Sequence, residues 1–179
     1  MQQYIIWKKN NINTKVNFYS PELDKSLIKS LKNFKYPKEF DEIKHIIEAV
    51  SNEHFYQDSQ FKIEVFIGDA RVYIPTLFKI DIVYQDPFSS NVNKELWTKE
   101  YFKDIVNILD FNALITTYSV ATPVRLSMSE NDLYIYEFNP TKSRKATIAS
   151  NNLIDYKDLK FINMEKKKQN NPNAKSLVD

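Results

Sequence analysis

Cysteine is absent from this sequence of 179 residues. Its absence excludes disulfides, cysteine-ligated zinc sites and a cysteine nucleophile, and it suits a reducing compartment. No apolar run approaches the roughly 20 residues that a membrane-spanning helix needs. The N-terminus also lacks the pattern of a signal peptide. We therefore expect a cytoplasmic protein with no membrane partner.

Glycine is almost absent, because Gly68 is the only one in the chain. An α/β domain that binds a nucleotide normally uses several glycines where its backbone approaches the ligand. A single glycine cannot build a P-loop or a Rossmann fingerprint, so both are excluded. Histidine is scarce too, and the scattered His45 and His54 do not form a metal site. We expect no metal.

The remaining composition is that of a globular protein, with 42% hydrophobic and 27% charged residues. The net charge of +2 is unevenly distributed, since residues 142–179 hold nine basic and four acidic side chains. A basic C-terminal part could meet an RNA backbone, although a solvated tail is the alternative. We expect one domain over residues 1–163 and a basic, flexible tail over residues 164–179.

Hydrophobic periodicity predicts an alternation of strands and helices. A helix is expected to begin at Ser20, which is a good N-cap and is followed by Pro21. Strands are predicted over 16–19, 61–67, 79–84 and 113–118, and further helices over 38–52, 94–109 and 121–130. Two more strands, over 133–138 and 146–148, suggest an antiparallel closure. The order predicts an α/β fold with a mostly parallel sheet.

The most informative segment is Gln85–Thr98, which follows the predicted strand over 79–84 and contains Asp86-Pro87-Phe88. Ligands of open α/β sheets bind at the carboxyl ends of the strands. There, Asp86 could accept a proton or hydrogen bond from an amine, with the free carbonyl of Pro87 as a second acceptor. Phe88 offers a face for a flat ring. An ordinary turn is the alternative, because Asp and Pro are common turn residues.

Four segments occur in the order 65–71, 86–98, 116–119 and 146–149. Together they resemble the methyltransferase module of the bacterial tRNA 5-methylaminomethyl-2-thiouridine-forming enzymes. Some of these enzymes consist of this module alone, and others fuse it to a flavin oxidase. The resemblance covers roughly residues 15–150. It implies a Rossmann-like class I fold, S-adenosyl-L-methionine as cofactor, and tRNA, through its anticodon loop, as partner. A separate flavin-dependent oxidase would be a further partner.

The resemblance also assigns cofactor-binding residues. Glu22, with Asp24 beside it, matches the acid that holds the cofactor ribose. Asp69, between Gly68 and Ala70, matches the acid that contacts the adenine amino group. The competing interpretations are structural: Glu22 as an acid in the first turn of a helix and Asp69 as a turn residue.

The resemblance also assigns catalytic and substrate-binding residues. Asp86 matches the catalytic carboxylate of the family, with Pro87, and Phe88 matches its pocket aromatic. Tyr118 lies at the edge of the same pocket, or else only caps a buried strand. Trp97 is a candidate substrate contact for which packing is the stronger alternative. Arg144, in Ser143-Arg144-Lys145, resembles a basic pair of the family whose order differs here.

The glycine-rich loop of the family has no counterpart, because counting back about 20 residues from Glu22 reaches Met1. We therefore expect an N-terminally truncated domain whose first strand would lie between the strands at 16–19 and 79–84. The rival is that Tyr4-Ile5-Ile6-Trp7 replaces that strand.

The resemblance implies N-methylation of the 5-aminomethyl group of the tRNA wobble uridine. Asp-Pro-Phe also resembles the Asp/Asn-Pro-Pro-aromatic loop of other amino-methyltransferases, so another amine is an alternative substrate. An inactive or RNA-binding fragment is the alternative outside enzymes, and the missing glycine loop and basic tail favour it.

Overall fold

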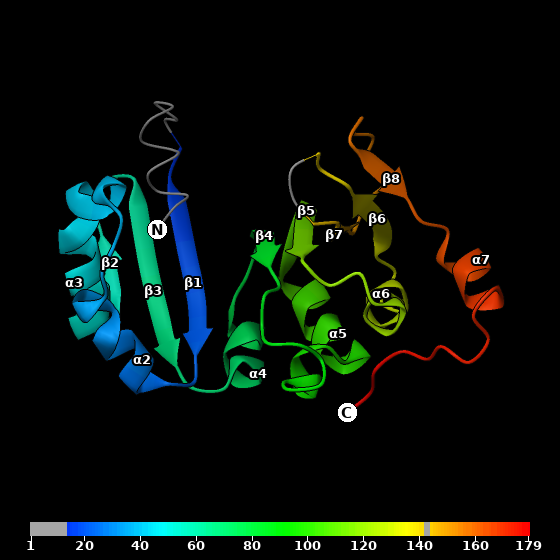
Figure 1. The fold of residues 1–179 in the computed structure, drawn as a ribbon, viewed down its shortest axis with the longest axis horizontal. Helices are drawn as coiled ribbons and strands as arrows, with labels where there is room; N and C mark the ends of the chain where they lie inside the picture. Colours follow the sequence, from blue (N-terminus) through cyan, green and yellow to red (C-terminus); the bar gives the residue numbers. More distant parts are fainter. Residues whose placement is uncertain (1–13, 142–143) are drawn as a thin grey trace. The chain divides into compact units, whose positions relative to one another are not determined.

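A computed structural model describes residues 14–141 and 144–179 (Figure 1). The chain divides into two units, Met1–Tyr73 and Ile74–Asp179, and each is described by itself. One domain over residues 1–163 stays a prediction. The alternatives for residues 4–7 and the role of Ser143 lie outside the described residues.

The first unit is built on a three-stranded sheet of order β1-β3-β2. Strand β1 (Val16–Glu22) runs parallel to β3 (Phe61–Ile67), and Glu22 is the register partner of Ile67. Strand β2 (Phe55–Gln57), which the sequence did not predict, pairs antiparallel with β3. The two parallel strands therefore bring their carboxyl ends to one edge of the sheet.

The predicted helix start at Ser20 is wrong. Because β1 stays paired with β3 as far as Glu22, Ser20 lies within the strand. The first helix, α2 (Lys25–Ser30), is capped instead by Asp24, whose carboxylate accepts the backbone N–H groups of Ser26 and Leu27. Strand pairing thus outweighs a favourable N-cap sequence at Ser20.

Four further helices follow α2 in the described part of this unit. They are the 3₁₀ helices η1 (Leu31–Asn33) and η2 (Lys38–Ile43), and the α-helices α3 (Lys44–Glu53) and α4 (Ala70–Tyr73). The segment predicted as one helix over 38–52 is therefore η2 followed by α3. The apolar face of α3 covers the face of β3 that carries Phe61, Ile63 and Val65 and so buries the core of this unit.

The second unit contains a five-stranded sheet of order β4-β5-β7-β6-β8. Its strands are β4 (Ile80–Tyr84), β5 (Leu109–Thr117), β6 (Tyr134–Phe138), β7 (Ala146–Ser150) and β8 (Leu159–Phe161). Strands β4 and β5 pair in parallel, and the remaining pairs are antiparallel. The predicted α/β class and the antiparallel closure are both confirmed. In the described residues β1 ends one sheet and β4 ends the other, and these are the strands between which the resemblance places a first strand.

The helices of the second unit fill its core. They are η3 (Ile74–Thr76), η4 (Lys94–Leu96), α5 (Lys99–Ile108), α6 (Thr122–Ser129) and α7 (Met164–Gln169). The helix predicted over 94–109 is interrupted at Trp97 and restarts at Thr98, which caps α5. Buried side chains of α5, including Phe102 and Ile105, pack with residues of β5, α6 and β6.

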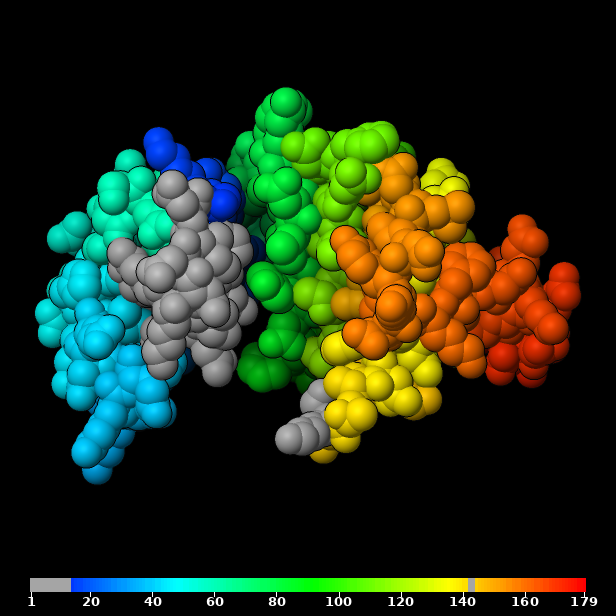
Figure 2. All heavy atoms as spheres, turned by 90° about the horizontal axis from the view of Figure 1, so that it is seen from above, coloured from blue at the N-terminus to red at the C-terminus, as the bar shows by residue number. Residues whose placement is uncertain are grey.

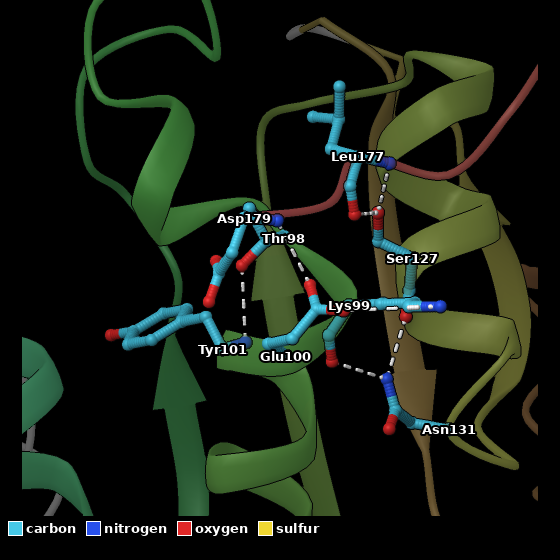
Figure 3. Close-up of polar contacts among 8 residues, drawn as sticks. All are labelled: Thr98, Lys99, Glu100, Tyr101, Ser127, Asn131, Leu177 and Asp179. Carbon is cyan, nitrogen blue, oxygen red and sulfur yellow. Dashed lines mark hydrogen bonds and ion pairs between the residues drawn. The ribbon is translucent and has the colours of Figure 1, made fainter.

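The C-terminal residues differ from the predicted flexible tail. Residues 164–169 form α7, and half-buried Met164 and Leu177 pack against the core. The N–H of Leu177 donates to Ser127 Oγ at 2.9 Å (Figure 3). The carbonyl of Leu177 accepts from Lys99 N at 2.9 Å. The basic composition of α7 does not reveal this packing, which depends on the two apolar side chains of Met164 and Leu177.

One face of the second unit exposes apolar side chains after β7. The residues that follow β7, orange in Figure 2, lie on the surface shown there. Leu153, Tyr156 and Phe161 in this part of the chain are each at least half exposed. They form part of the surface of the second unit.

Candidate active site

Gln85 begins the loop that follows β4. Its backbone N–H donates to Thr116 O at 2.9 Å, which continues the β4–β5 ladder by one residue. Its side chain is buried, and Nε2 donates to Leu96 O at 2.6 Å. Because both bonds are made to ordered elements, the loop leaves the sheet at a defined place. Sequence reasoning missed Gln85, although a polar residue directly after an apolar strand was a usable signal.

Two carbonyl groups hold the rest of the loop. The hydroxyl of Tyr118 donates to Pro87 O at 3.0 Å, and Trp97 Nε1 donates to Phe88 O at 2.8 Å. The rings of Trp97 and Tyr118 meet edge to face, with centroids 5.9 Å apart. Tyr118 takes one of the two lone pairs of Pro87 O, and the role of this carbonyl as a second acceptor for an amine stays a prediction.

The side chains of the loop point outward from this anchored backbone. Asp86 is exposed, and Phe88 has 76% of its surface accessible. Tyr118, from the residue after β5, is half exposed, so its ring lies at the surface while its hydroxyl holds the loop. The arrangement offers a carboxylate for accepting a proton and two aromatic faces for contacting a flat ring.

Trp97 does not offer a substrate surface. Its side chain is only 1% exposed, and its indole N–H is used by Phe88 O. This burial does not fit the candidate role as a substrate contact. The buried indole instead positions the loop through its hydrogen bond to Phe88 O. The packing alternative that the sequence favoured is the one that fits its burial.

Arg144 is exposed on the connection between β6 and β7. The neighbouring Lys145 donates to Glu137 Oε1 at 2.9 Å. This hydrogen bond, together with the positive charges of Lys145 and Arg125, lowers the pKa of Glu137. The charge of Lys145 is thus partly compensated by a carboxylate.

The acids predicted for cofactor binding lie at the carboxyl edge of the β1–β3 pair in the first unit. Glu22 is the last residue of β1, its Oε1 accepts the N–H of Asp24, and its carbonyl accepts the N–H of Gly68 at 3.0 Å. Gly68 leads directly into Asp69 at the start of α4. Glu22 and Asp69 are therefore brought to the same edge, and their cofactor-binding roles stay predictions.

Asp24 and Asp69 also have local structural roles. A hydrogen bond from the Ser26 hydroxyl, with the backbone N–H groups of Leu27 and Ser26, lowers the pKa of Asp24. Asp69 Oδ1 accepts the N–H of Arg71 at 2.8 Å and so caps α4. One oxygen of Asp24 is thus committed to capping α2, and the role of Glu22 as ribose ligand stays a prediction.

Gly68 is required by its surroundings. Its φ of +154° lies where side chains are rarely tolerated, and an added Cβ would come within 2.6 Å of Phe66 Cε1. Phe66 in turn stacks on Tyr73 of α4, with ring centroids 4.6 Å apart. The glycine therefore lets the chain turn tightly from β3 to Asp69, while half-buried Ala70 begins α4.

Within residues 14–141 and 144–179, no three or more His, Asp or Glu side chains cluster in a way that could hold a metal ion. In the same described residues, no helix is both long enough and apolar enough to cross a membrane.

Comparison with known proteins identifies a family that matches this chain. Residues 37–152 match the family described as S-adenosyl-L-methionine-dependent methyltransferase. Over 83 residues the chain is 25% identical to the tRNA 5-methylaminomethyl-2-thiouridine biosynthesis bifunctional protein MnmC of Acinetobacter baylyi, an alignment that covers 45% of this chain and 13% of that protein.

Two solved structures extend the comparison. MnmC2 from Aquifex aeolicus superimposes with a TM-score of 0.75 and 27% identity over 97% of this chain and 55% of that one. A probable spermidine synthase from Corynebacterium glutamicum, 11% identical with a TM-score of 0.54, covers 99% of this chain and 77% of that one and shares the fold alone. The chain thus spans about half of MnmC2 and a smaller part of the bifunctional protein.

Proposed function

Because the chain belongs to the S-adenosyl-L-methionine-dependent methyltransferase family matched by residues 37–152, we propose that it transfers a methyl group to an amine. The proposed acceptor is the 5-aminomethyl group of the tRNA wobble uridine. The names of the relatives support this substrate class, because MnmC is named for the biosynthesis of 5-methylaminomethyl-2-thiouridine in tRNA.

One observation carries the proposal. The exposed carboxylate of Asp86 stands on a loop whose next two carbonyls are held by Tyr118 and Trp97. A carboxylate that is exposed and fixed by its backbone can meet an amine without first paying to order the loop. An ordinary surface turn would not need a buried indole to hold it.

The cofactor fits the carboxylates at the edge of the first unit. Glu22, held by the N–H of Asp24, would bind the ribose hydroxyls, and Asp69 after Gly68 would accept from the adenine amino group. Carboxylates suit both tasks, because ribose hydroxyls and an exocyclic amine are hydrogen-bond donors. When bound, S-adenosyl-L-methionine supplies a methyl group that its sulfonium sulfur already activates.

Asp86 would then align the amine and take its proton. The amine must be neutral to attack, and a carboxylate that accepts its N–H hydrogen bond directs the nitrogen lone pair toward the methyl group. As the new N–C bond forms, the bond between the methyl group and sulfur would break to leave a neutral thioether, and the amine proton would go to Asp86 directly or through water. Pro87 O, which keeps one lone pair beside the bond from Tyr118, would be the second acceptor for the amine.

The aromatic side chains and basic residues would bind the RNA. Phe88 and Tyr118 would hold the uracil ring after it leaves the anticodon stack, since both expose ring surface beside Asp86. Arg144 and the lysines of α7 would contact phosphates, which position an RNA without reading its sequence. A separate flavin-dependent oxidase would be a further partner, as resemblance to the family implies.

The test uses S-adenosyl-L-methionine with a tritiated methyl group and tRNA whose wobble uridine carries an unmethylated aminomethyl group. Asp86→Asn is expected to lower turnover by at least about 100-fold, the usual minimum for losing a general base. Calorimetric titration should give an S-adenosyl-L-methionine Kd within about threefold of wild type. The matched control is Asp81→Asn, which neutralises an exposed acid on β4 and should change neither value.

The outcomes separate the candidates. An Asp86→Asn protein that keeps most of the wild-type turnover would remove Asp86 from its assigned role. Methyl transfer to small amines or peptides but not to tRNA would favour the other amino-methyltransferases. Retained tRNA binding without cofactor binding would identify an RNA-binding fragment instead of an enzyme.

A further inference from the structure

Helix α6 places a charged side chain in the core of the second unit. Arg125 is only 3% exposed, and its neighbours Val124 and Leu126 are buried beside it. A buried guanidinium is costly because it gives up its hydration, and such groups are retained where their contacts serve a purpose. The proposed chemistry does not use Arg125.

Arg125 is held by strands β6 and β7. Its Nη2 lies 3.5 Å from Glu137 Oε2 and makes an ion pair, but it forms no hydrogen bond within the described residues. Its Nε donates to Thr147 Oγ1 at 2.9 Å. The strongest directional contact of this buried cation is therefore with the hydroxyl of Thr147.

The Thr147 hydroxyl also forms a hydrogen bond to the turn after β5. Thr147 Oγ1 donates to Ser119 O at 2.6 Å. The Thr147 hydroxyl oxygen accepts the N–H of Arg125 with one lone pair. Its single proton is therefore donated to the carbonyl of Ser119. Ser119 N also donates to Thr117 Oγ1 at 3.2 Å, which ties the same turn to the end of β5.

This turn contains the side chain that holds the candidate catalytic loop. Tyr118 lies between Thr117 and Ser119, and its hydroxyl donates to Pro87 O at 3.0 Å. The buried cation of α6 is thus linked to the residue beside Asp86 by three hydrogen bonds and one peptide step. All of these residues belong to the second unit.

We propose that Arg125 and Thr147 are positioning residues for methyl transfer: through Ser119 they set the place of Tyr118, which holds the Asp86-Pro87-Phe88 loop. Neither residue touches the substrate. The inference rests on the proposed function for its effect on turnover, but the link itself can be observed without turnover.

A double-mutant cycle between Thr147→Val and Tyr118→Phe tests the link. Valine keeps the shape of threonine and removes the hydroxyl, and phenylalanine removes only the hydroxyl of Tyr118. Each single variant is expected to lower kcat about tenfold with little change in the KM for S-adenosyl-L-methionine, and the double variant should be scarcely worse than either one. Such non-additivity is the mark of side chains that act through one another.

Ser150→Ala is the matched control. Ser150 is also buried on β7, and its hydroxyl donates to a carbonyl of β5, that of Ala113, at 3.1 Å, so its loss removes a similar bond away from the turn. We expect Ser150→Ala to lower stability without lowering kcat. Thr147→Ser, which keeps the hydroxyl, should retain the wild-type kcat.

A spectroscopic readout distinguishes failure of the link from failure of the proposed function. Trp7→Phe leaves Trp97 as the only tryptophan, and its ring contacts Tyr118. Thr147→Val and Tyr118→Phe should shift the Trp97 emission in the same direction, even if the wild-type chain methylates no tRNA. Arg125→Lys, which keeps the charge but loses the donor to Thr147, is the second variant if Thr147→Val does not fold.

Two results would overturn the proposal. One is a kcat loss in the double variant equal to the product of the single losses, because independent sites multiply. The other is a Thr147→Val or Arg125→Lys protein that is destabilised but keeps the wild-type Trp97 emission, because the network would then be structural only.

Discussion

Tyr118 both holds the candidate catalytic loop and exposes part of its side chain at the surface. Its hydroxyl holds Pro87 O, its ring edge meets Trp97, and about half of its surface stays exposed. Phe88 is held through its backbone alone. Its carbonyl accepts from Trp97, while its ring lies exposed outside the core. At the scale of single residues, the candidate site is therefore ordered through backbone carbonyls and leaves its side chains available.

Glu137 carries the pH dependence that is easiest to test. The hydrogen bond from Lys145, with the charges of Lys145 and Arg125, lowers the pKa of Glu137, and partial burial opposes this less strongly. A carboxyl whose folded pKa lies below its unfolded value of about 4.3 stabilises the fold fully above that value. Its contribution is lost as the pH falls through the lower, folded pKa.

Glu137→Gln should therefore destabilise the protein by about 1–3 kcal/mol at pH 7, and the loss should shrink as the solution is acidified below about pH 4. Urea unfolding followed at both pH values measures this difference. Glu130→Gln is the control, because its ion pair with Lys168 is exposed and should contribute no more than about 1 kcal/mol. Equal destabilisation by Glu137→Gln at neutral and acid pH would exclude the ion pair as its cause.

At the scale of elements, helix ends decide where the site residues lie. The apolar pattern over 94–109 predicts one helix, but the chain breaks at Trp97 so that its indole can reach Phe88 O. Thr98 then restarts the helix, with its Oγ1 accepting Tyr101 N at 3.2 Å (Figure 3). The break in the helix and the anchoring of the loop are thus one structural feature.

Thr98→Ala should cost about 1 kcal/mol of unfolding free energy, because it leaves the first turn of α5 without its cap. The side chain is fully buried, so water cannot replace the lost acceptor. Thermal unfolding followed by circular dichroism is the measurement, and Thr98→Ser, which keeps the hydroxyl, is the control. If both variants lose the same stability, the methyl group rather than the cap is what matters at this position.

At the scale of the molecule, residues far apart in the chain complete the second unit. Leu177 lies 50 residues beyond Ser127, yet its backbone N–H is bonded to that hydroxyl and its side chain packs on the core. Asp179 N likewise donates to Glu100 Oε2 at 3.2 Å. The basic C-terminal segment is therefore part of the packed structure of this unit.

Leu177→Ala should lower the free energy of unfolding by about 1–3 kcal/mol, less than a fully buried leucine because the residue is half exposed. The backbone bonds to Ser127 and Lys99 are expected to remain. Leu153→Ala, at a position 69% exposed, should change stability by less than about 0.5 kcal/mol. Chemical denaturation measures both, and faster trypsin cleavage at Lys175 in Leu177→Ala alone would report loss of the anchor.

The sequence by itself determined the α/β class, most strands and helices, and the family. Residues 61–67 alternate as a strand must, and the order of four short segments led to the methyltransferase module that the comparisons support. These are local signals, which depend on a few neighbouring residues. The same signals placed Asp86 and Phe88 on a loop directly after a strand.

Only the tertiary structure decided how that loop is held, where β1 ends and what Arg125 does. The bond from Tyr118 to Pro87 O spans 31 residues, and the bond from Arg125 to Thr147 spans 22. Residue types predict that a tyrosine or an arginine can donate a hydrogen bond, but not which carbonyl or hydroxyl the fold brings within 3 Å. That choice depends on strand register and packing, which involve the whole unit at once.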